Sequence, residues 1–167
     1  FTGQGSFSAA MLTDFTGSIL TLDDSAQSVS TAGLSQIDHA RFILSNGTSF
    51  DQKNDDDYFI TSGGAVNAAV MSASGEGTVL DAGSITKIDG YADHWGTNTR
   101  TIAASNEGVI DLSAVTNIRG GSGTHGGMDS VKVIAQTGGL IDMSSLTTVD
   151  GYTFFEANAG GILQFGD

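Results

Sequence analysis

Three stretches of this sequence decide its fold: LDAGSITKIDG (residues 80–90), IDLSAVTNIRG (residues 110–120) and IDMSSLTTVDG (residues 141–151). They align with one another without gaps and begin 30 and then 31 residues apart. A Gly-containing turn stands shortly before each stretch, and a short apolar segment stands before each turn. A period near 30 residues indicates a stacked repeat, because no single unit can bury its apolar face without its neighbours.

Two weaker copies extend the repeat toward both ends of the chain. GGILQFGD (residues 160–167) aligns with the start of the copy at residues 141–151, after a shortened link. GSILTLD (residues 17–23) aligns in turn with GGILQFG, and residues 34–38 align with residues 115–119 after an insertion. The repeat therefore covers most of the chain.

The apolar runs predict strands. They are short and separated by Gly and Ser, whereas a helical repeat needs helix-period segments of about 10–12 residues or more. We expect an all-β fold, a parallel β-helix or β-solenoid with three short strands per rung and a period of about 22–31 residues. It forms a single domain over residues 1–167. Residues 1–64 supply irregular N-terminal rungs with long insertions, and residues 65–167 supply regular rungs with an open C-terminal end.

The direction of side chains within a rung follows from strand alternation. In the copy at residues 110–120, Ile110 and Leu112 point inward and Asp111 points outward. After a short corner, Val115 and Ile118 point inward, and a Gly then releases the chain into a variable link.

This pattern resembles the right-handed parallel β-helix of secreted bacterial surface proteins and phage tail fibres. The resemblance covers residues 80–167 well and residues 17–37 loosely. It is architectural, so it implies the handedness of the coil and an extracellular setting but assigns no functional residue.

Composition narrows the function. The formal net charge is −13, from 19 acidic and 6 basic residues, and such a surface repels nucleic acid and anionic membranes. No run of apolar residues is long enough to span a membrane. There is no Cys, which excludes disulfides and thiolate metal sites. The chain begins with Phe1 and not with Met, so we expect a processed or excised piece of a secreted protein.

Stacking turns the alignment of the copies into columns of side chains. Asp89, Arg119 and Asp150 share one position and are expected to form an alternating, structural charge column. A second position holds three carboxylates, which would repel one another at the spacing of adjacent rungs: Asp81, Asp111 and Asp142. Either each Asp accepts backbone N–H bonds in an Asx-turn, or the column binds calcium through its oxygen atoms.

The links between copies are the other candidate functional elements, because loops on one face of a solenoid often carry its function. They are residues 38–64, 90–100 and 120–130, and all are expected to leave the same corner. The first contains Asp55, Asp56 and Asp57, which are either solvated or a calcium site without EF-hand spacing.

The second and third links contain the aromatic and histidine candidates for ligand binding: Tyr91, His94, Trp95 and His125. Trp95 either stacks on a sugar ring or folds down to cap its own loop. His94 and His125 leave equivalent points of neighbouring rungs, but a zinc site would need a third ligand.

We expect a non-enzymatic, structural or adhesive protein, either a fibre or matrix subunit or a segment of a cell-surface adhesin. The alternative is a glycan-binding module or a polysaccharide-degrading β-helix enzyme. By resemblance, such enzymes use a basic residue beside an acidic calcium site, and no basic groove is visible here. The expected partner is another copy stacked end to end, or further repeats of a longer chain. A glycan is the other candidate partner, and calcium is the only cofactor considered.

Overall fold

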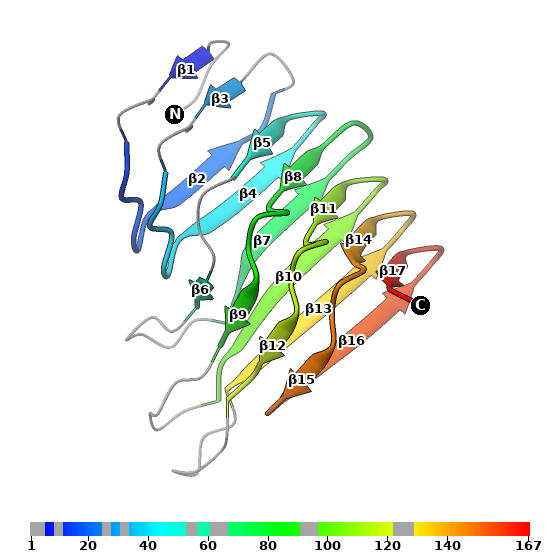
Figure 1. Cartoon of the computed structure of the whole chain (residues 1–167). Coiled ribbons are helices and arrows are strands. Elements are labelled where there is room, and N and C mark those ends of the chain that lie inside the picture. Colours follow the sequence, from blue (N-terminus) through cyan, green and yellow to red (C-terminus); the bar gives the residue numbers. More distant parts are fainter. Residues whose placement is uncertain are drawn as a thin grey trace.

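The chain is a parallel β-solenoid (Figure 1). The computed structural model describes residues 6–8, 12–24, 28–30, 34–52, 57–60, 67–90, 97–121 and 129–167. All regular elements in these residues are strands, and every pairing between them is parallel. The predicted fold class is confirmed.

Three sheets run along the solenoid. The six-stranded sheet holds the longest strands, which are β2 (Ile19–Leu22), β4 (Arg41–Ser45), β7 (Ala68–Ser74), β10 (Thr99–Ser105), β13 (Ser130–Gln136) and β16 (Thr153–Asn158). The seven-stranded sheet consists of β1 (Ser6–Ser8), β3 (Ser28–Ser30), β5 (Ser49–Asp51), β8 (Val79–Asp81), β11 (Val109–Asp111), β14 (Leu140–Met143) and β17 (Ile162–Phe165). The four-stranded sheet consists of β6 (Asp57–Phe59), β9 (Lys87–Asp89), β12 (Asn117–Arg119) and β15 (Thr148–Asp150).

Each complete rung visits the sheets in one order, for example β10, β11 and β12. The three-stranded rung predicted from the sequence is therefore confirmed. The chain then passes through a link into the six-stranded sheet of the next rung (Figure 1). The link after β15 is only two residues long, which agrees with the shortened spacing of the last copy.

The turn between the first two strands of a rung explains the recurring Gly. In the turn before β14, Thr137 and Gly138 both have positive φ, of 51° and 76°. The next residue, Gly139, lies so close to the rung below that an added Cβ would collide with the backbone of Ala104. Gly108 and Gly161 meet the rung below them in the same way. Thr48 and Thr78 occupy this position in the two preceding turns, so the approach that excludes a side chain belongs to the last three turns.

The core consists of the inward residues of all three sheets. Ile110, Leu112, Val115 and Ile118 are fully buried, as their alternation predicts. Ile110 and Ile118 have register partners in the rungs above and below them, so their two columns are continuous through the central rungs. Fully burying one such aliphatic side chain contributes about 1.5–3 kcal/mol.

Two sequence predictions for the N-terminal half were wrong. Residues 17–23 were aligned with the last strand, yet β2 pairs with β4 in the six-stranded sheet, while β17 lies in the seven-stranded sheet. The sequence predicts a variable link over residues 38–64, yet this range contains β4, β5 and β6, one strand of each sheet. Both errors have one cause: short apolar strands of different sheets share the same alternation, and the side chains of this rung differ in identity from the later copies.

The match between residues 34–38 and residues 115–119 agrees with the structure. The N–H of His39 bonds to the carbonyl of Phe59, and the N–H of Gly90 bonds in the same way to the carbonyl of Arg119. The N–H of Gly120 continues the series with the carbonyl of Asp150. The predicted corner thus repeats from the N-terminal rungs to the C-terminal ones.

Candidate functional site: side-chain columns and the terminal rung

The aspartate column is in register and is longer than predicted. Asp81, Asp111 and Asp142 are direct partners in adjacent strands, and Asp51 of β5 extends the column by one rung. The Oδ1 atom of each predicted member accepts the N–H two residues further on, from Gly83, Ser113 and Ser144, at 3.1, 2.8 and 2.9 Å. These Asx-turns explain how the three predicted acids can share one column, because each of their carboxylates has its own backbone donor.

Calcium binding by this column stays a prediction. Among the residues that the structure describes, no group of three or more His, Cys, Asp or Glu side chains is arranged to hold a metal ion. Asp57, the described member of the acidic run, lies in β6 beside Lys87. Asp55 and Asp56 lie outside the described residues.

The charge column also forms. Asp89, Arg119 and Asp150 are register partners, with 3.6 Å between Arg119 Nε and Asp89 Oδ1. Lys87 Nζ reaches the other oxygen of Asp89, also at 3.6 Å, and lies 5.4 Å from the centre of the Phe59 ring. Asp89 is only 5% exposed, so these two cations offset the burial of its charge and give the column a structural role.

The predicted ligand-binding residues Tyr91, His94, Trp95 and His125 lie outside the described residues. Their glycan and zinc interpretations therefore stay predictions.

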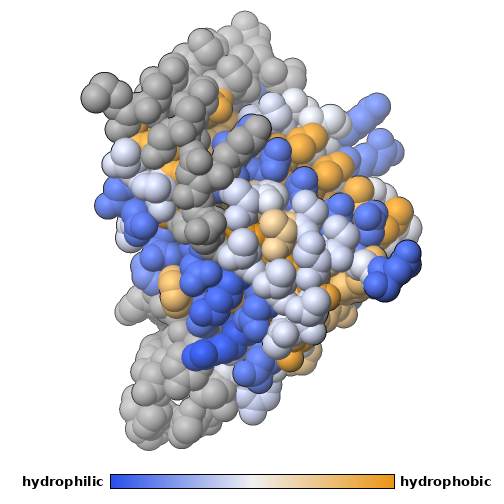
Figure 2. Space-filling model, in the orientation of Figure 1, coloured by the Kyte–Doolittle hydropathy of each residue, from blue (hydrophilic) through white to orange (hydrophobic). Residues whose placement is uncertain are grey.

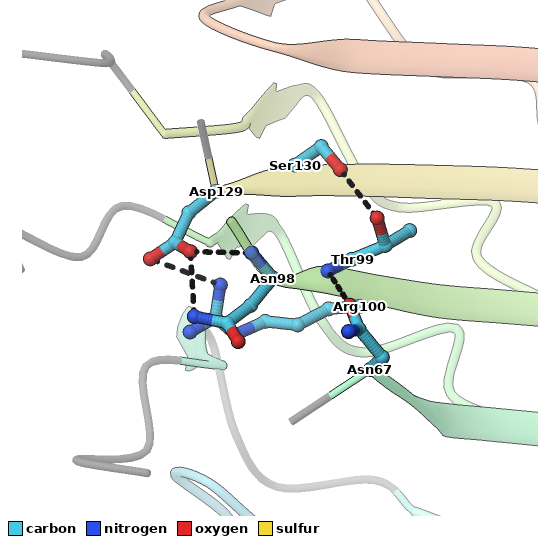
Figure 3. Close-up of polar contacts among 6 residues, drawn as sticks. All are labelled: Asn67, Asn98, Thr99, Arg100, Asp129 and Ser130. Carbon is cyan, nitrogen blue, oxygen red and sulfur yellow. Dashed lines mark hydrogen bonds and ion pairs between the residues drawn. The ribbon is translucent and has the colours of Figure 1, made fainter. Parts of the chain in front are cut away.

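A buried polar cluster was missed in the sequence. Arg100 points inward from β10 and is 1% exposed, and its Nη1 lies 3.5 Å from Oδ2 of Asp129 (Figure 3). The other carboxylate oxygen of Asp129 accepts two bonds from Asn98, one from its backbone N–H at 3.0 Å and one from its side-chain amide at 2.8 Å. The signal was present, because Arg100 has the same parity in its strand as the buried residues Ile102 and Ala104.

The strands β15, β16 and β17 end the three sheets and together make the last turn of the coil, which we call the terminal rung, and this rung leaves its apolar core uncovered. Val149 is 48% exposed, whereas Ile118, directly beneath it in the same column, is fully buried. Phe165 is 47% exposed above the fully buried Met143. Each of these three strands forms the end of its sheet, so backbone donors and acceptors along one edge have no strand beyond them in the described chain.

A row of apolar side chains on the outer face of the seven-stranded sheet ends at the terminal rung. Val79, Val109, Leu140 and Ile162 are register partners in the seven-stranded sheet, and their side chains point outward. Figure 2 shows apolar residues in an oblique row on this face. Ile162, in the last rung, is the most exposed member at 54%.

Fold and columns together define the class as a parallel β-solenoid. None of the protein-family models, curated proteins or solved structures compared with this chain matches it. In the described part of the chain, no helix is long and apolar enough to cross a membrane.

Proposed function

We propose that this chain is a non-enzymatic structural or adhesive segment of an extracellular protein, and that another β-solenoid rung covers its terminal rung. The observation that carries the proposal is the exposure of core residues at β15, β16 and β17, with Val149 and Phe165 each about half exposed.

The chemistry of this surface favours another rung as its partner. An added rung would pair its backbone with three parallel edges at once, at the strand spacing of about 4.8 Å that separates the existing rungs. It would also continue the apolar columns that now end in solvent. Burying two half-exposed side chains of this size contributes a few kcal/mol, on a scale of about 1.5–3 kcal/mol for each fully buried one.

Further repeats of the same polypeptide or a second copy of this chain can supply that rung. A contact between the last rung of one copy and the first rung of the next is head to tail, so it does not close and propagates into a filament. Filament subunit and adhesin segment are thus two forms of one proposal.

The non-enzymatic part of the proposal is supported by the use of the acidic side chains. The Asp81, Asp111 and Asp142 carboxylates cap turns, and Asp89 is held between cations. The extracellular setting rests on the resemblance to secreted β-helices.

Electron microscopy of the purified chain at neutral pH, with and without Ca²⁺, tests the proposal. We expect ordered filaments, and we expect Phe165→Lys to disperse them because it places a charge in the stacking core. Gln164→Lys is the matched control, since this neighbouring side chain points outward from the same strand. Dispersed wild-type particles in both conditions would exclude the filament and leave the adhesin segment.

A second candidate function, glycan binding, is favoured by a hollow on the outer surface. The hollow has a volume of about 210 Å³ and is lined by Thr97, Thr99, Ser130, Tyr152 and Phe154. Tyr152 and Phe154 are 38% and 54% exposed, and aromatic faces beside hydroxyl groups suit a sugar ring. A glycan array comparing wild type with Phe154→Ala tests this candidate, and equal binding by both would exclude this hollow.

A further inference from the structure

A second cavity lies at the corner where the chain enters the six-stranded sheet. Its volume is about 210 Å³, and its walls come from four successive rungs. The residues that matter for its chemistry are Ile19, His39, Arg41, Ile60, Val70 and Arg100. Three of them are apolar and the other three carry nitrogen donors, so the cavity combines apolar walls with a basic side.

The basic side contrasts with the rest of the molecule. The chain has 6 basic residues and a formal net charge of −13, yet Arg41 and Arg100 line the same small cavity together with one of the 3 His residues. The nearby carboxylates are already engaged. Asp129 binds Asn98, and Oδ1 of Asp38 accepts the N–H of Phe59 at 3.0 Å.

Arg100 has donor capacity that the protein does not use. Its guanidinium is buried, and its Nε, Nη1 and Nη2 atoms make no hydrogen bond in the structure. The contact with Asp129 is an ion pair at 3.5 Å. A buried guanidinium carries five N–H donors, and leaving them without acceptors is costly, so an acceptor in the cavity would stabilise it.

A β-bulge shapes the part of the wall that Val70 forms. Thr101 pairs with Ala69 and Ile102 pairs with Met71, so Val70 is an extra residue in β7 and turns inward beside Met71. Nε of Arg41 donates to the carbonyl of Ala69 at 2.8 Å, which holds this second guanidinium at the cavity wall. Bulges of this kind often re-aim side chains at functional sites.

His39 adds a third nitrogen group. Its Nδ1 atom is buried without a hydrogen-bond partner, and its backbone has a φ of 61°, which is uncommon for a residue other than Gly. Acidic residues far outnumber His in this chain, yet the residue that lines the cavity here is a His.

We propose that this cavity binds a small monocarboxylate with a short apolar chain. The carboxylate accepts hydrogen bonds from Arg100, whose planar fork fits two oxygen atoms, with Arg41 and His39 beside it. The apolar chain packs against Ile60 and Val70. Pockets for drug-sized ligands measure about 300–1,000 Å³, so a cavity of this size takes only a small molecule.

Butyrate is the probe for the test. Isothermal titration calorimetry with sodium butyrate, in buffer matched with sodium chloride, measures affinity, and saturation-transfer difference NMR reports contact of the butyrate methyl group with the protein. We expect saturable butyrate binding by wild type. Removing a charged hydrogen-bond donor in Arg100→Met should weaken binding at least about tenfold.

Lys132→Gln is the matched control, because it removes one positive charge from a partly exposed side chain that pairs with Glu156 and does not line the cavity, so it should leave the affinity unchanged. Arg41→Gln changes a less buried wall residue and keeps the test decisive if Arg100→Met does not fold. The proposal is overturned if wild type shows no butyrate binding above chloride, or if neither Arg100→Met nor Arg41→Gln weakens it. It is also overturned if inorganic phosphate binds as tightly as butyrate, because the apolar walls would then contribute nothing.

Discussion

Replacing Gly139 with Ala tests the stacking of the turns. An added Cβ would collide with the backbone of Ala104 and approach the N–H of Ser105, so the two rungs must separate locally. Backbone cannot move aside as a flexible side chain can, and overpacking of this kind costs about 1–3 kcal/mol. With an m-value of about 2 kcal/mol per M of urea, the unfolding midpoint should fall by about 0.5–1.5 M.

The assay is equilibrium urea unfolding followed by far-UV circular dichroism. Thr137→Ala is the matched control in the same turn. Its φ of 51° is already positive, and Ala159 occupies the equivalent position of the next turn with a φ of 48°. Thr137→Ala should therefore change stability by less than about 0.5 kcal/mol. If Gly139→Ala shifts the midpoint no more than Thr137→Ala does, close stacking of the rungs does not explain this glycine.

Two further predictions concern the core columns and a surface acid. Ile118→Ala, in a fully buried column, should lower the free energy of unfolding by about 2–5 kcal/mol, whereas Val149→Ala, half exposed in the last rung, should lower it by less than about 1 kcal/mol in dilute protein. If copies stack, the effect of Val149→Ala should grow with protein concentration, and a constant effect would contradict stacking. The Lys132 side chain, followed by Asn158, hydrogen-bonds to Glu156 and lowers its pKa, so this carboxylate stabilises the folded state above its unfolded pKa and the contribution is lost as the pH falls. In Lys132→Gln the Glu156 pKa should rise toward its ordinary value in an NMR titration, and an unchanged pKa would show that Lys132 is not the cause.

The two proposals use different parts of the fold. The terminal rung offers backbone edges and open apolar columns, which suit a partner of the same architecture. The cavity reaches from β2 to Arg100 of β10, two strands before β16 in the same sheet, and offers buried donors, which suit a small anion. Variants at Phe165 test only the stacking proposal and variants at Arg100 test only the carboxylate-binding proposal, so either proposal can be refuted without the other.

The repeated part of the chain was predictable from the sequence for a physical reason. Parallel stacking in register places the same position of successive copies side by side, so an alignment is already a contact map. This is why Asp89 could be paired with Arg119 and why the aspartate column was expected before the strands were seen.

Alternation of apolar and polar residues predicts strands in the N-terminal rungs too, but it does not show to which sheet each strand belongs. Phe50 stacks on Leu80, and Tyr58 stacks on Ile88. A core column requires only that each member be apolar and fill its space. Residues of different identity meet this requirement, so the repeat cannot be recognised from residue identity. Residues 38–64 therefore looked like a link although they build a complete rung.

By itself, the sequence determined that this protein is a stack of short parallel strands, because apolar residues at period two within copies about 30 residues apart have no other way to share a core. Only the tertiary structure decided which side chains meet across different positions of the repeat. Arg100 and Asp129 do not occupy the same position in their copies, and Arg41 reaches the carbonyl that a bulge in β7 presents to it. Such contacts depend on the reach of long side chains and on local irregularity of the backbone, and the alternation of apolar residues carries no information about either.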